Sequence, residues 1–559
     1  MGFAELLDRV GGLGRFQIIQ LIMLCIPIFL MAGHNLLQNF SAAIPDHKCK
    51  VNESATLNTS LKDGDGWQTL FSLTDGNGKL DGCFERIQIQ QKLVTSNTSW
   101  QNATYIDTIP CRNGWEYDRK EFSSTIITEW DLVCSNKHKR QLAQSIYMAG
   151  VLAGAIILGG LSDKYGRRAM LIWSYLQMAI SGTCTAFSPN YLSYCVFRFL
   201  VGMSLSGISL NTTALIVEWV PTKVRTIVGT IAGYCYTAGQ LLLAGLAYGI
   251  RDWRWLQLAI SIPFIIFFFY SWWFPESARW LVLSGNPEKA VKVIKNVAVF
   301  NGKKEEAEKI TLESLKSDMV KEVACGKETY SIVDLVRTST LRRISCFVSF
   351  VWFSTSFSYY GLAMDLQKFG ISIYLVQVIF GSVDIPAKLV STACMIYIGR
   401  RVTQCASLIL GGLAVLANIF VPTDLQILRT SLAVFGKGCF ASSFSCVFLY
   451  TTEMYPTVVR QSGLGLGSTM ARMGGIVAPL VKMLGGFYPF LPLAIYGAAP
   501  IISGLLVYFL PETVNKPLPD TIEDVELGSK TQAKQKKELV PLESQTNTVP
   551  QELKDGHEK

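Results

Sequence analysis

Long apolar stretches separated by short polar segments dominate this chain. Runs such as 16–44, 260–274 and 408–421 contain no Asp, Glu, Lys or Arg. A helix needs roughly 20 mostly apolar residues to cross a bilayer core of about 30 Å. The pattern therefore predicts an all-α membrane protein with twelve transmembrane helices, near residues 16–44, 141–161, 171–187, 191–217, 226–248, 256–274, 341–366, 372–397, 403–421, 427–451, 461–484 and 491–510.

A polar, Lys- and Glu-rich stretch with helical periodicity separates the sixth predicted span from the seventh. The first apolar run is too long for the core of a cleavable signal peptide, so we expect it to remain as an anchor. The predicted organisation is a cytoplasmic N-terminus (1–15), a first six-helix bundle (16–274) that includes an extracellular loop (45–140), a cytoplasmic linker (275–340), a second bundle (341–510) and a cytoplasmic tail (511–559) that is disordered beyond Val525.

The orientation follows from the basic residues of the short loops, because Lys and Arg are retained on the cytoplasmic side. The loops 162–169, 218–226, 399–402 and 453–460 carry eight Lys or Arg, whereas the short loops on the opposite side carry three. This bias predicts a multi-pass protein of the plasma membrane with both termini in the cytoplasm.

The loop 45–140 has the features of an extracellular segment. It contains four cysteines, Cys49, Cys83, Cys111 and Cys134, which could form two disulfides in any of three pairings. It also contains four glycosylation sequons, at Asn52, Asn58, Asn97 and Asn102. Together these features indicate an oxidising compartment and a glycoprotein.

Composition narrows the class of function. The chain is 50% hydrophobic and only 17% charged, which suits a lipid environment. Its formal charge of +9 is spread over loops and a polar tail, so we expect no nucleic-acid partner. Without a nucleotide-binding loop or clustered metal ligands, we expect no enzyme activity, no metal and no cofactor other than chloride as a candidate ion.

Three motifs recur at nearly one offset. The pattern E-x-x-P-T-x-V-R begins at Glu218 and again at Glu453, 235 residues later, Gly-Arg-Arg at Gly166 returns at Gly399, and Pro-Glu-Ser at Pro275 returns as Pro-Glu-Thr. Six predicted spans separate the copies, so the two bundles should be parallel repeats related by an axis along the membrane normal.

Charged residues of these motifs gather at the predicted cytoplasmic helix ends, where charge pairs could hold the ends together and must rearrange when the bundles move. We predict a gating role for Asp163, Arg167, Arg168, Glu218, Arg225, Arg400, Arg401, Glu453 and Arg460.

Ionisable residues within spans are costly and mark a cavity or pathway. Arg472 lies 12 residues beyond Arg460, and Lys388 lies 12 residues before Arg400, which puts both near the midplane at 1.5 Å per residue. Asp384 lies one turn from Lys388 and is its obvious partner, so Lys388 is expected either to form a structural ion pair with Asp384 or to contact the substrate directly. The span of Arg472 contains no acid, which favours a mobile anion as its counter-charge.

Aromatic residues at a comparable depth could line a cage for flat, hydrophobic molecules. They come from the fifth, seventh and tenth predicted spans, and with the two bases they form the predicted substrate site: Arg472, Lys388, Tyr236, Trp352, Tyr359, Tyr360, Phe444 and Phe448.

The segment Gly160-Leu-Ser-Asp163-Lys-Tyr-Gly166-Arg-Arg168 resembles the loop signature of the major facilitator superfamily, and Pro275-Glu-Ser-Ala-Arg279-Trp-Leu resembles its sugar-porter and organic-ion branch. The long loop with Ser123-Ser-Thr-Ile-Ile-Thr-Glu-Trp-Asp-Leu-Val-Cys134 is similar to organic ion transporters of solute carrier family 22. Tyr359-Tyr-Gly-Leu-Ala-Met-Asp-Leu-Gln367 and Leu13-Gly-Arg-Phe-Gln17 resemble the organic anion branch.

This resemblance implies the major facilitator fold and transport of small organic anions by alternating access, in exchange for an intracellular dicarboxylate such as 2-oxoglutarate. It also implies that a basic residue at Arg472 marks the anion branch, that Asn39, Ser209 and Ser468 supply polar contacts, and that Ser209 and Arg472 adjoin a chloride position. Thr213 departs from the methionine of some relatives, so the shape of the pocket stays open.

Four alternatives remain. An organic cation transporter of this fold would need an unpaired midplane acid, for which Asp384 is the candidate. A urate-type exchanger would share the anion site, whereas a sugar facilitator would need a Gln- and Asn-rich pocket. A non-transporting receptor would not need gating motifs in both halves.

Overall fold

The structure is a computed structural model of residues 1–559. It describes residues 3–50, 72–74, 80–86, 108–221, 224–318 and 334–514, except 365, 370, 423 and 457, and a few residues between 519 and 526. The four sequons, Asp365 and the tail beyond Glu526 lie outside the described residues, whereas Glu526, which was expected to be disordered, accepts two hydrogen bonds from Thr340.

Apolar helices form the first bundle because only their internal hydrogen bonds satisfy the backbone in lipid. The first predicted span is two helices, α2 (Arg15–Leu36) and α3 (Gln38–Ser41), and the sixth is α11 (Trp253–Ser261), α12 (Pro263–Tyr270) and η4 (Ser271–Trp273). The second to fifth spans are single helices: α7 (His138–Tyr165), α8 (Arg167–Ala186), α9 (Tyr191–Trp219) and α10 (Arg225–Gly249).

The second bundle repeats this arrangement in the later half of the chain. Its helices are α19 (Ser339–Ala363), α20 (Ile373–Tyr397), α21 (Arg400–Phe420), α22 (Gln426–Met454), α23 (Arg460–Met483) and α24 (Leu491–Val507), with short turns η5 (Leu366–Phe369) and η6 (Leu484–Gly486). Within the described residues, nine helices are both long and apolar enough to span a membrane by composition alone. The others, α8, α19 and α24, are more polar or shorter.

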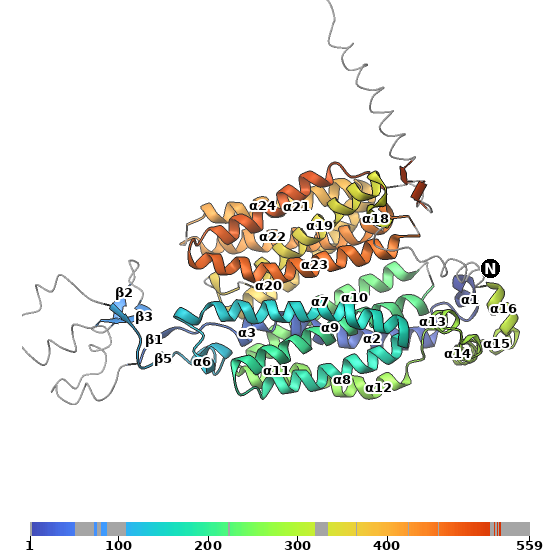
Figure 1. The fold of residues 1–559 in the computed structure, drawn as a ribbon, viewed down its shortest axis with the longest axis horizontal. Helices are drawn as coiled ribbons and strands as arrows, with labels where there is room; N and C mark the ends of the chain where they lie inside the picture. Colours follow the sequence, from blue (N-terminus) through green and yellow to red (C-terminus); the bar gives the residue numbers. More distant parts are fainter. Residues whose placement is uncertain are drawn as a thin grey trace, which may run out of the picture.

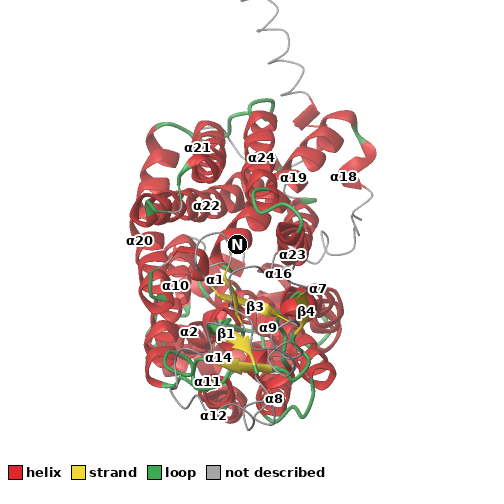
Figure 2. Ribbon diagram, turned by 90° about the vertical axis from the view of Figure 1, so that its left-hand side faces the viewer, coloured by secondary structure: helices red, strands yellow, loops and turns green. Residues whose placement is uncertain are grey.

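The two bundles lie side by side with their helices roughly parallel (Figure 1). They meet along two seams, where α7 packs against α23 and α10 against α20 (Figure 2). Within the first bundle α7 packs on α9, and the corresponding α20 packs on α22. Gly202 allows the α7–α9 approach, because a Cβ there would lie 2.2 Å from the carbonyl oxygen of Tyr147.

Short helices gather at one end of the bundles, near α1 (Phe3–Arg9) (Figure 1). They come from the linker: α13 (Ala278–Leu283), α14 (Pro287–Phe300), α15 (Lys304–Lys309), α16 (Leu312–Asp318) and α18 (Asp334–Arg337). We call this end, which also carries the repeated motifs, the motif end.

The opposite end, the loop end, carries five short strands and two small helical turns. They are β1 (His47–Cys49), β2 (Ser72–Thr74), β3 (Leu80–Arg86), β4 (Thr108–Pro110), β5 (Trp115–Tyr117), α6 (Ile126–Trp130) and η2 (Cys134–Asn136). β1 pairs antiparallel with β5 in the register His47↔Tyr117, and β3 lies between β2 and β4.

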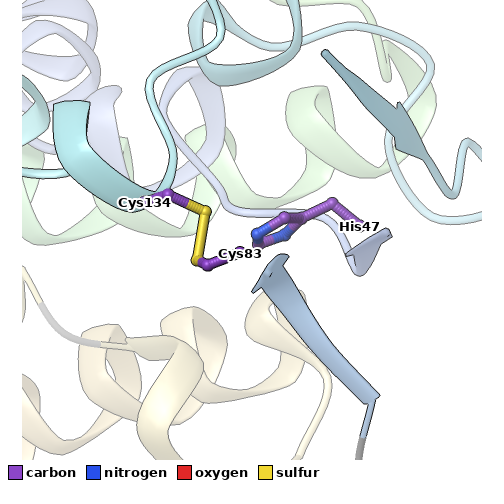
Figure 3. Close-up of side chains that lie close together, drawn as sticks. All are labelled: His47, Cys83 and Cys134. Carbon is purple, nitrogen blue, oxygen red and sulfur yellow. A yellow bond between two sulfur atoms is a disulfide. The ribbon is translucent and has the colours of Figure 1, made fainter. Parts of the chain in front are cut away.

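Two disulfides connect the segments of the loop end. They correspond to one of the three pairings that the sequence left open. Cys49 bonds Cys111, and Cys83 bonds Cys134, which ties β3 to the start of α7. His47 lies beside the second disulfide (Figure 3). Because both sulfur atoms are already bonded to each other, these three residues do not make a metal site.

Candidate functional site

The predicted gating residues form two clusters at the motif end, one in each bundle. In the first, the Arg167 guanidinium lies 3.1 Å from Asp163 and 3.5 Å from Glu218. In the second, Arg400 lies 3.0 Å from Glu453. The structure thus brings these five residues together as corresponding pairs, as the internal repeat predicts.

The other predicted gating arginines contact backbone carbonyls or a ring in their own bundle. Arg168 donates to Trp272, Arg225 to Val220 and Arg460 to Tyr455. Arg401 lies 5.6 Å from the ring centroid of Tyr508. These contacts fasten helix ends within one bundle.

Two glutamates that we did not single out from the sequence complete the clusters. Glu276 accepts hydrogen bonds from the backbone N–H groups of Arg167 and Arg168 at the start of α8. Glu512 accepts the corresponding bonds from Arg400 and Arg401 at the start of α21. Carboxylates at helix N-termini satisfy free N–H groups and stabilise the positive end of the helix dipole. The sequence feature that could have identified Glu276 and Glu512 is the Pro-Glu dipeptide, which occurs at corresponding positions in both halves of the chain.

Gly166 is required where the first cluster turns. Its φ is +101°, and a Cβ there would lie 2.3 Å from a carboxylate oxygen of Glu276. Any other residue would be strained and would displace the capping carboxylate.

Burial affects the two capping carboxyls differently. Burial raises the pKa of Glu276 and outweighs the backbone hydrogen bonds that oppose it. At Glu512 burial also acts to raise the pKa, but four backbone hydrogen bonds outweigh it and the pKa is lowered. The ionised cap is therefore more stable in the second bundle.

The expected pairing of Lys388 with Asp384 is wrong. The Asp384 carboxylate lies 2.8 Å from the Lys437 ammonium of α22, and its other oxygen accepts a hydrogen bond from Gln240 of α10 at 3.1 Å. Asp384 is 2% exposed and Lys437 is 1% exposed. The i, i+4 rule concerns pairs of residues on the same helix. The partner of Asp384 is Lys437, which lies on the neighbouring helix α22.

Lys388 instead faces the first bundle. Its ammonium donates to the Gly233 carbonyl at 3.1 Å and to the Thr237 hydroxyl at 3.0 Å, both on α10, and lies 5.9 Å from the ring centroid of Tyr234. Lys388 thus bonds neutral acceptors and makes no direct bond to Asp384, although the two groups still attract each other electrostatically.

Arg472 is partly buried and bonded to hydroxyls. Its guanidinium donates to the hydroxyl and the carbonyl of Ser468 and contacts the Ser206 hydroxyl of α9 at 3.5 Å. Its Nε is buried without a partner, and within the described residues it forms no ion pair. The α9 hydroxyl that contacts Arg472 belongs to Ser206, whereas Ser209, the predicted chloride contact, lies one turn farther along α9.

Five of the predicted aromatic residues form a continuous series of ring contacts. Trp352 contacts Phe444 and Phe448, and Tyr359 contacts Phe444 and Tyr360, with centroids 5.5 to 6.5 Å apart. All of these contacts are edge-to-face, which is favourable for aromatic pairs. Phe448 remains 55% exposed, so the series ends at an open surface.

Tyr236 leads to an arginine that the sequence reasoning missed. Its hydroxyl accepts a hydrogen bond from the side-chain amide nitrogen of Asn35 at 3.0 Å, and the side-chain amide oxygen of Asn35 accepts one from the Tyr147 hydroxyl at 2.8 Å. The guanidinium of Arg198 lies 4.5 Å from the ring centroid of Tyr147. Arg198 is 0% exposed, and in the described residues its three nitrogens have no hydrogen-bond acceptor. An arginine within the fourth predicted span was itself the signal.

Asn39 lies between the bundles at the loop end. Its amide donates to the Ala363 carbonyl at 2.8 Å, and Gln367 bonds both backbone groups of Ile44. Ser145 donates to Ile476 across the α7–α23 seam at 3.0 Å. These bonds close the two bundles against each other at the loop end.

Comparisons with known proteins agree with this architecture. The profile of a family described as "Sugar (and other) transporter" matches residues 96–524. The chain is 68% identical to solute carrier family 22 member 6-A of Xenopus laevis over 97% of each chain. It is 50% identical to organic anion transporter 3 of Pongo abelii over 98% of each chain.

Among solved structures, a D-xylose–proton symporter shares the fold with a TM-score of 0.56 at 16% identity, covering 90% of this chain and 99% of the symporter. An inward-open xylose transporter from E. coli gives a TM-score of 0.55 at 18% identity, covering 72% of this chain and 93% of the transporter. These similarities concern the fold alone.

Proposed function

The chain belongs to the sugar (and other) transporter family and, within it, to solute carrier family 22, and from that membership we propose that it transports small organic anions across the plasma membrane. The relatives named organic anion transporter support this substrate class. We propose further that transport proceeds by alternating access, with both termini in the cytoplasm and the loop end outside.

The observation that carries the substrate class is the charge balance midway along the helices. Lys388 and Arg472 contact hydroxyls and carbonyls, while the nearby acid Asp384 is already satisfied by Lys437 and Gln240. Two bases thus remain for a ligand. A buried guanidinium without an acid favours an anion that supplies the missing charge.

The same observation disfavours the cation alternative. A cation carrier of this fold needs a carboxylate free to bind substrate, and Asp384 was the candidate. A cation would have to displace the buried Lys437 ammonium at 2.8 Å from Asp384, which costs more than binding at a free acid.

Exchange for an intracellular dicarboxylate such as 2-oxoglutarate fits a site with two bases on opposite seams. Lys388 bridges α20 to α10, and Arg472 bridges α23 to α9. A dicarboxylate has two carboxylates to pair with two cations, whereas a monocarboxylate pairs with one. We propose the aromatic series, Tyr236 and Asn39 as the remainder of the site, with chloride as a candidate occupant near Arg472 when substrate is absent.

The test is anion uptake by Arg472 variants in cells, normalised to surface abundance. We expect Arg472→Ala and Arg472→Asp to abolish uptake of p-aminohippurate, and Arg472→Lys to retain weakened uptake, because lysine keeps the charge but lacks the two-pronged geometry that binds a carboxylate. Arg343→Ala, which removes a charge from an exposed position of α19, is the matched control. Wild-type rate and affinity in Arg472→Ala would refute the assignment.

A further inference from the structure

A small cavity between the bundles at the loop end combines basic, amide and aromatic side chains. It has a volume of about 20 Å³, and its lining includes Arg140 and Gln144 of α7, Lys482 of α23, and the rings of Tyr360 and Tyr496. We call it the outer cavity. It adjoins the proposed substrate site, because Tyr360 belongs to both.

The two cations of the outer cavity come from opposite bundles. The Arg140 guanidinium contacts the Gln367 side chain at 3.4 Å, and the Lys482 ammonium donates to the Met364 carbonyl at 2.9 Å. None of the residues that line the cavity, all of them in the described part of the chain, is acidic. The charged side chains that line the cavity are therefore both basic.

The unsatisfied side chain of Gln144 indicates that the outer cavity holds a ligand or water. It is 2% exposed, and neither its amide nitrogen nor its amide oxygen has a hydrogen-bond partner among the described residues. A buried amide with both groups unsatisfied is costly and indicates water or a ligand that supplies the missing bonds. About 20 Å³ is enough for a single water molecule and too little for an organic anion.

We propose that the outer cavity is the closed form of an external capture site for carboxylate-bearing organic anions. When the loop end opens, Arg140 and Lys482 hold the carboxylate of the arriving anion, Gln144 donates a hydrogen bond to it, and Tyr360 receives its apolar body on the way to Arg472. This inference rests on the proposed function and adds a second site to it.

The geometry explains why the site should act from one side only. The cavity lies among the contacts that close the loop end, so those contacts must part before an external anion can reach it. An anion bound from the motif end meets Arg472 and Lys388 first. Charge at the outer cavity should therefore affect the apparent affinity for external substrate more than that for internal substrate.

The experiment measures p-aminohippurate uptake and efflux with Arg140→Gln, Lys482→Gln and the double variant at equal surface abundance. We expect each single change to raise the external KM about three- to tenfold, and the double change to raise it further, because a partly screened charge contributes on that order. The KM for efflux from preloaded cells should stay within about twofold of wild type, since the cytoplasmic route does not use these charges.

Three variants separate a binding role from a merely structural one. Lys139→Gln removes a charge from the same end of α7 outside the cavity lining and should leave the external KM unchanged. Gln367→Ala removes the hydrogen bonds of Gln367 to Ile44 and Arg140 without removing a charge. It should alter the uptake rate, whereas the dependence of the external KM on ionic strength should stay as in the wild type. Arg140→Lys keeps the charge and should restore most of the affinity.

Ionic strength gives an independent readout. Raising salt from about 15 to about 150 mM at constant osmolarity shortens the screening length roughly threefold, so the external KM of the wild type should rise, and that of the double variant should rise much less. Equal KM values and equal salt dependence in the double variant and the wild type would overturn the capture site. Loss of transport only in Arg472 variants would then still support the proposed function, whereas absence of organic anion uptake by the wild type would refute the proposed function itself.

Discussion

The buried pair of Asp384 and Lys437 gives the sharpest quantitative test of the charge arrangement. Replacing Asp384 by Asn keeps the shape of the side chain but leaves the Lys437 ammonium with the Phe380 carbonyl and the face of Tyr359, whose centroid is 5.4 Å away, in place of a counter-charge. Replacing Lys437 by Met removes the directly bonded cation and leaves Gln240 as the hydrogen-bond donor to the carboxylate.

The magnitude follows from the 2.8 Å separation of the two charged atoms. At an effective dielectric constant near 20 the attraction is roughly 6 kcal/mol, and much of it offsets the cost of removing both ions from water. Breaking such a pair from one side typically costs about 3–5 kcal/mol. We therefore expect Asp384→Asn and Lys437→Met each to destabilise the protein by about 3–5 kcal/mol.

The double variant Asp384→Asn/Lys437→Met should be much closer to wild type than the sum of the singles, because it strands neither charge. Thermal unfolding of the purified protein in detergent, with surface abundance in cells as a second measure, provides the assay. Lys388→Met is the control: since Lys388 does not pair with Asp384, it should lose anion uptake with little loss of stability. Additive single effects, or a Lys388→Met change as damaging to folding as Lys437→Met, would refute the pairing.

Two further predictions concern the caps and the buried arginine. Glu512→Gln should destabilise the protein by about 0.5–2 kcal/mol and Glu276→Gln by less, because burial already raises the pKa of Glu276 and disfavours its ionised form. Because the pKa of Glu512 is lowered in the folded state, its stabilisation is fully present above the unfolded pKa and is lost as the pH falls through the folded pKa. Equal shifts in the unfolding temperature of Glu512→Gln and Glu276→Gln across this pH range would contradict the prediction. Arg198→Met should lower p-aminohippurate affinity by shifting Tyr147, Asn35 and Tyr236, an effect that Tyr147→Phe should reproduce in uptake assays; an unchanged KM in both variants would argue against the linkage.

The twelve spans and the repeat were predictable because lipid leaves the backbone few alternatives. The length of the apolar runs was enough to predict helices such as α7 and α22. The constant offset between the repeated motifs predicted which residues correspond in the two bundles, and the structure pairs Arg167 with Glu218 in one bundle and Arg400 with Glu453 in the other. The breaks within the first and sixth spans fall at Leu37 and Ile262, and both had a local signal: polar residues such as Asn35 and Gln38 flank the first break, and Pro263 directly follows the second.

The sequence predicted which residues lie at the depth of the site, but it did not predict which of them contact one another. Depth along a helix identified Arg472 and Lys388, since 1.5 Å per residue is a local property. The partner of Asp384 lies 53 residues away on another helix, so only the packing of α20 on α22 decides it. Arg198 lies within the fourth predicted span and carried the same signal as Arg472, a charge at membrane depth, but its neighbours Tyr147 and Asn35 come from other helices and only the packing shows them.

Under the proposed function, the contacts of Arg472 offer a way for a bound anion to shift the bundles between two states. A ligand shifts a conformational equilibrium only as far as its affinity differs between the two states. Arg472 lies on α23 but contacts Ser206 on α9, so a rocking motion that separates α9 from α23 removes one of its few hydrogen-bond partners. An anion bound to the guanidinium replaces that contact and stabilises whichever state has lost it. The carboxylate that makes the substrate recognisable would thus be the same group that couples binding to transport.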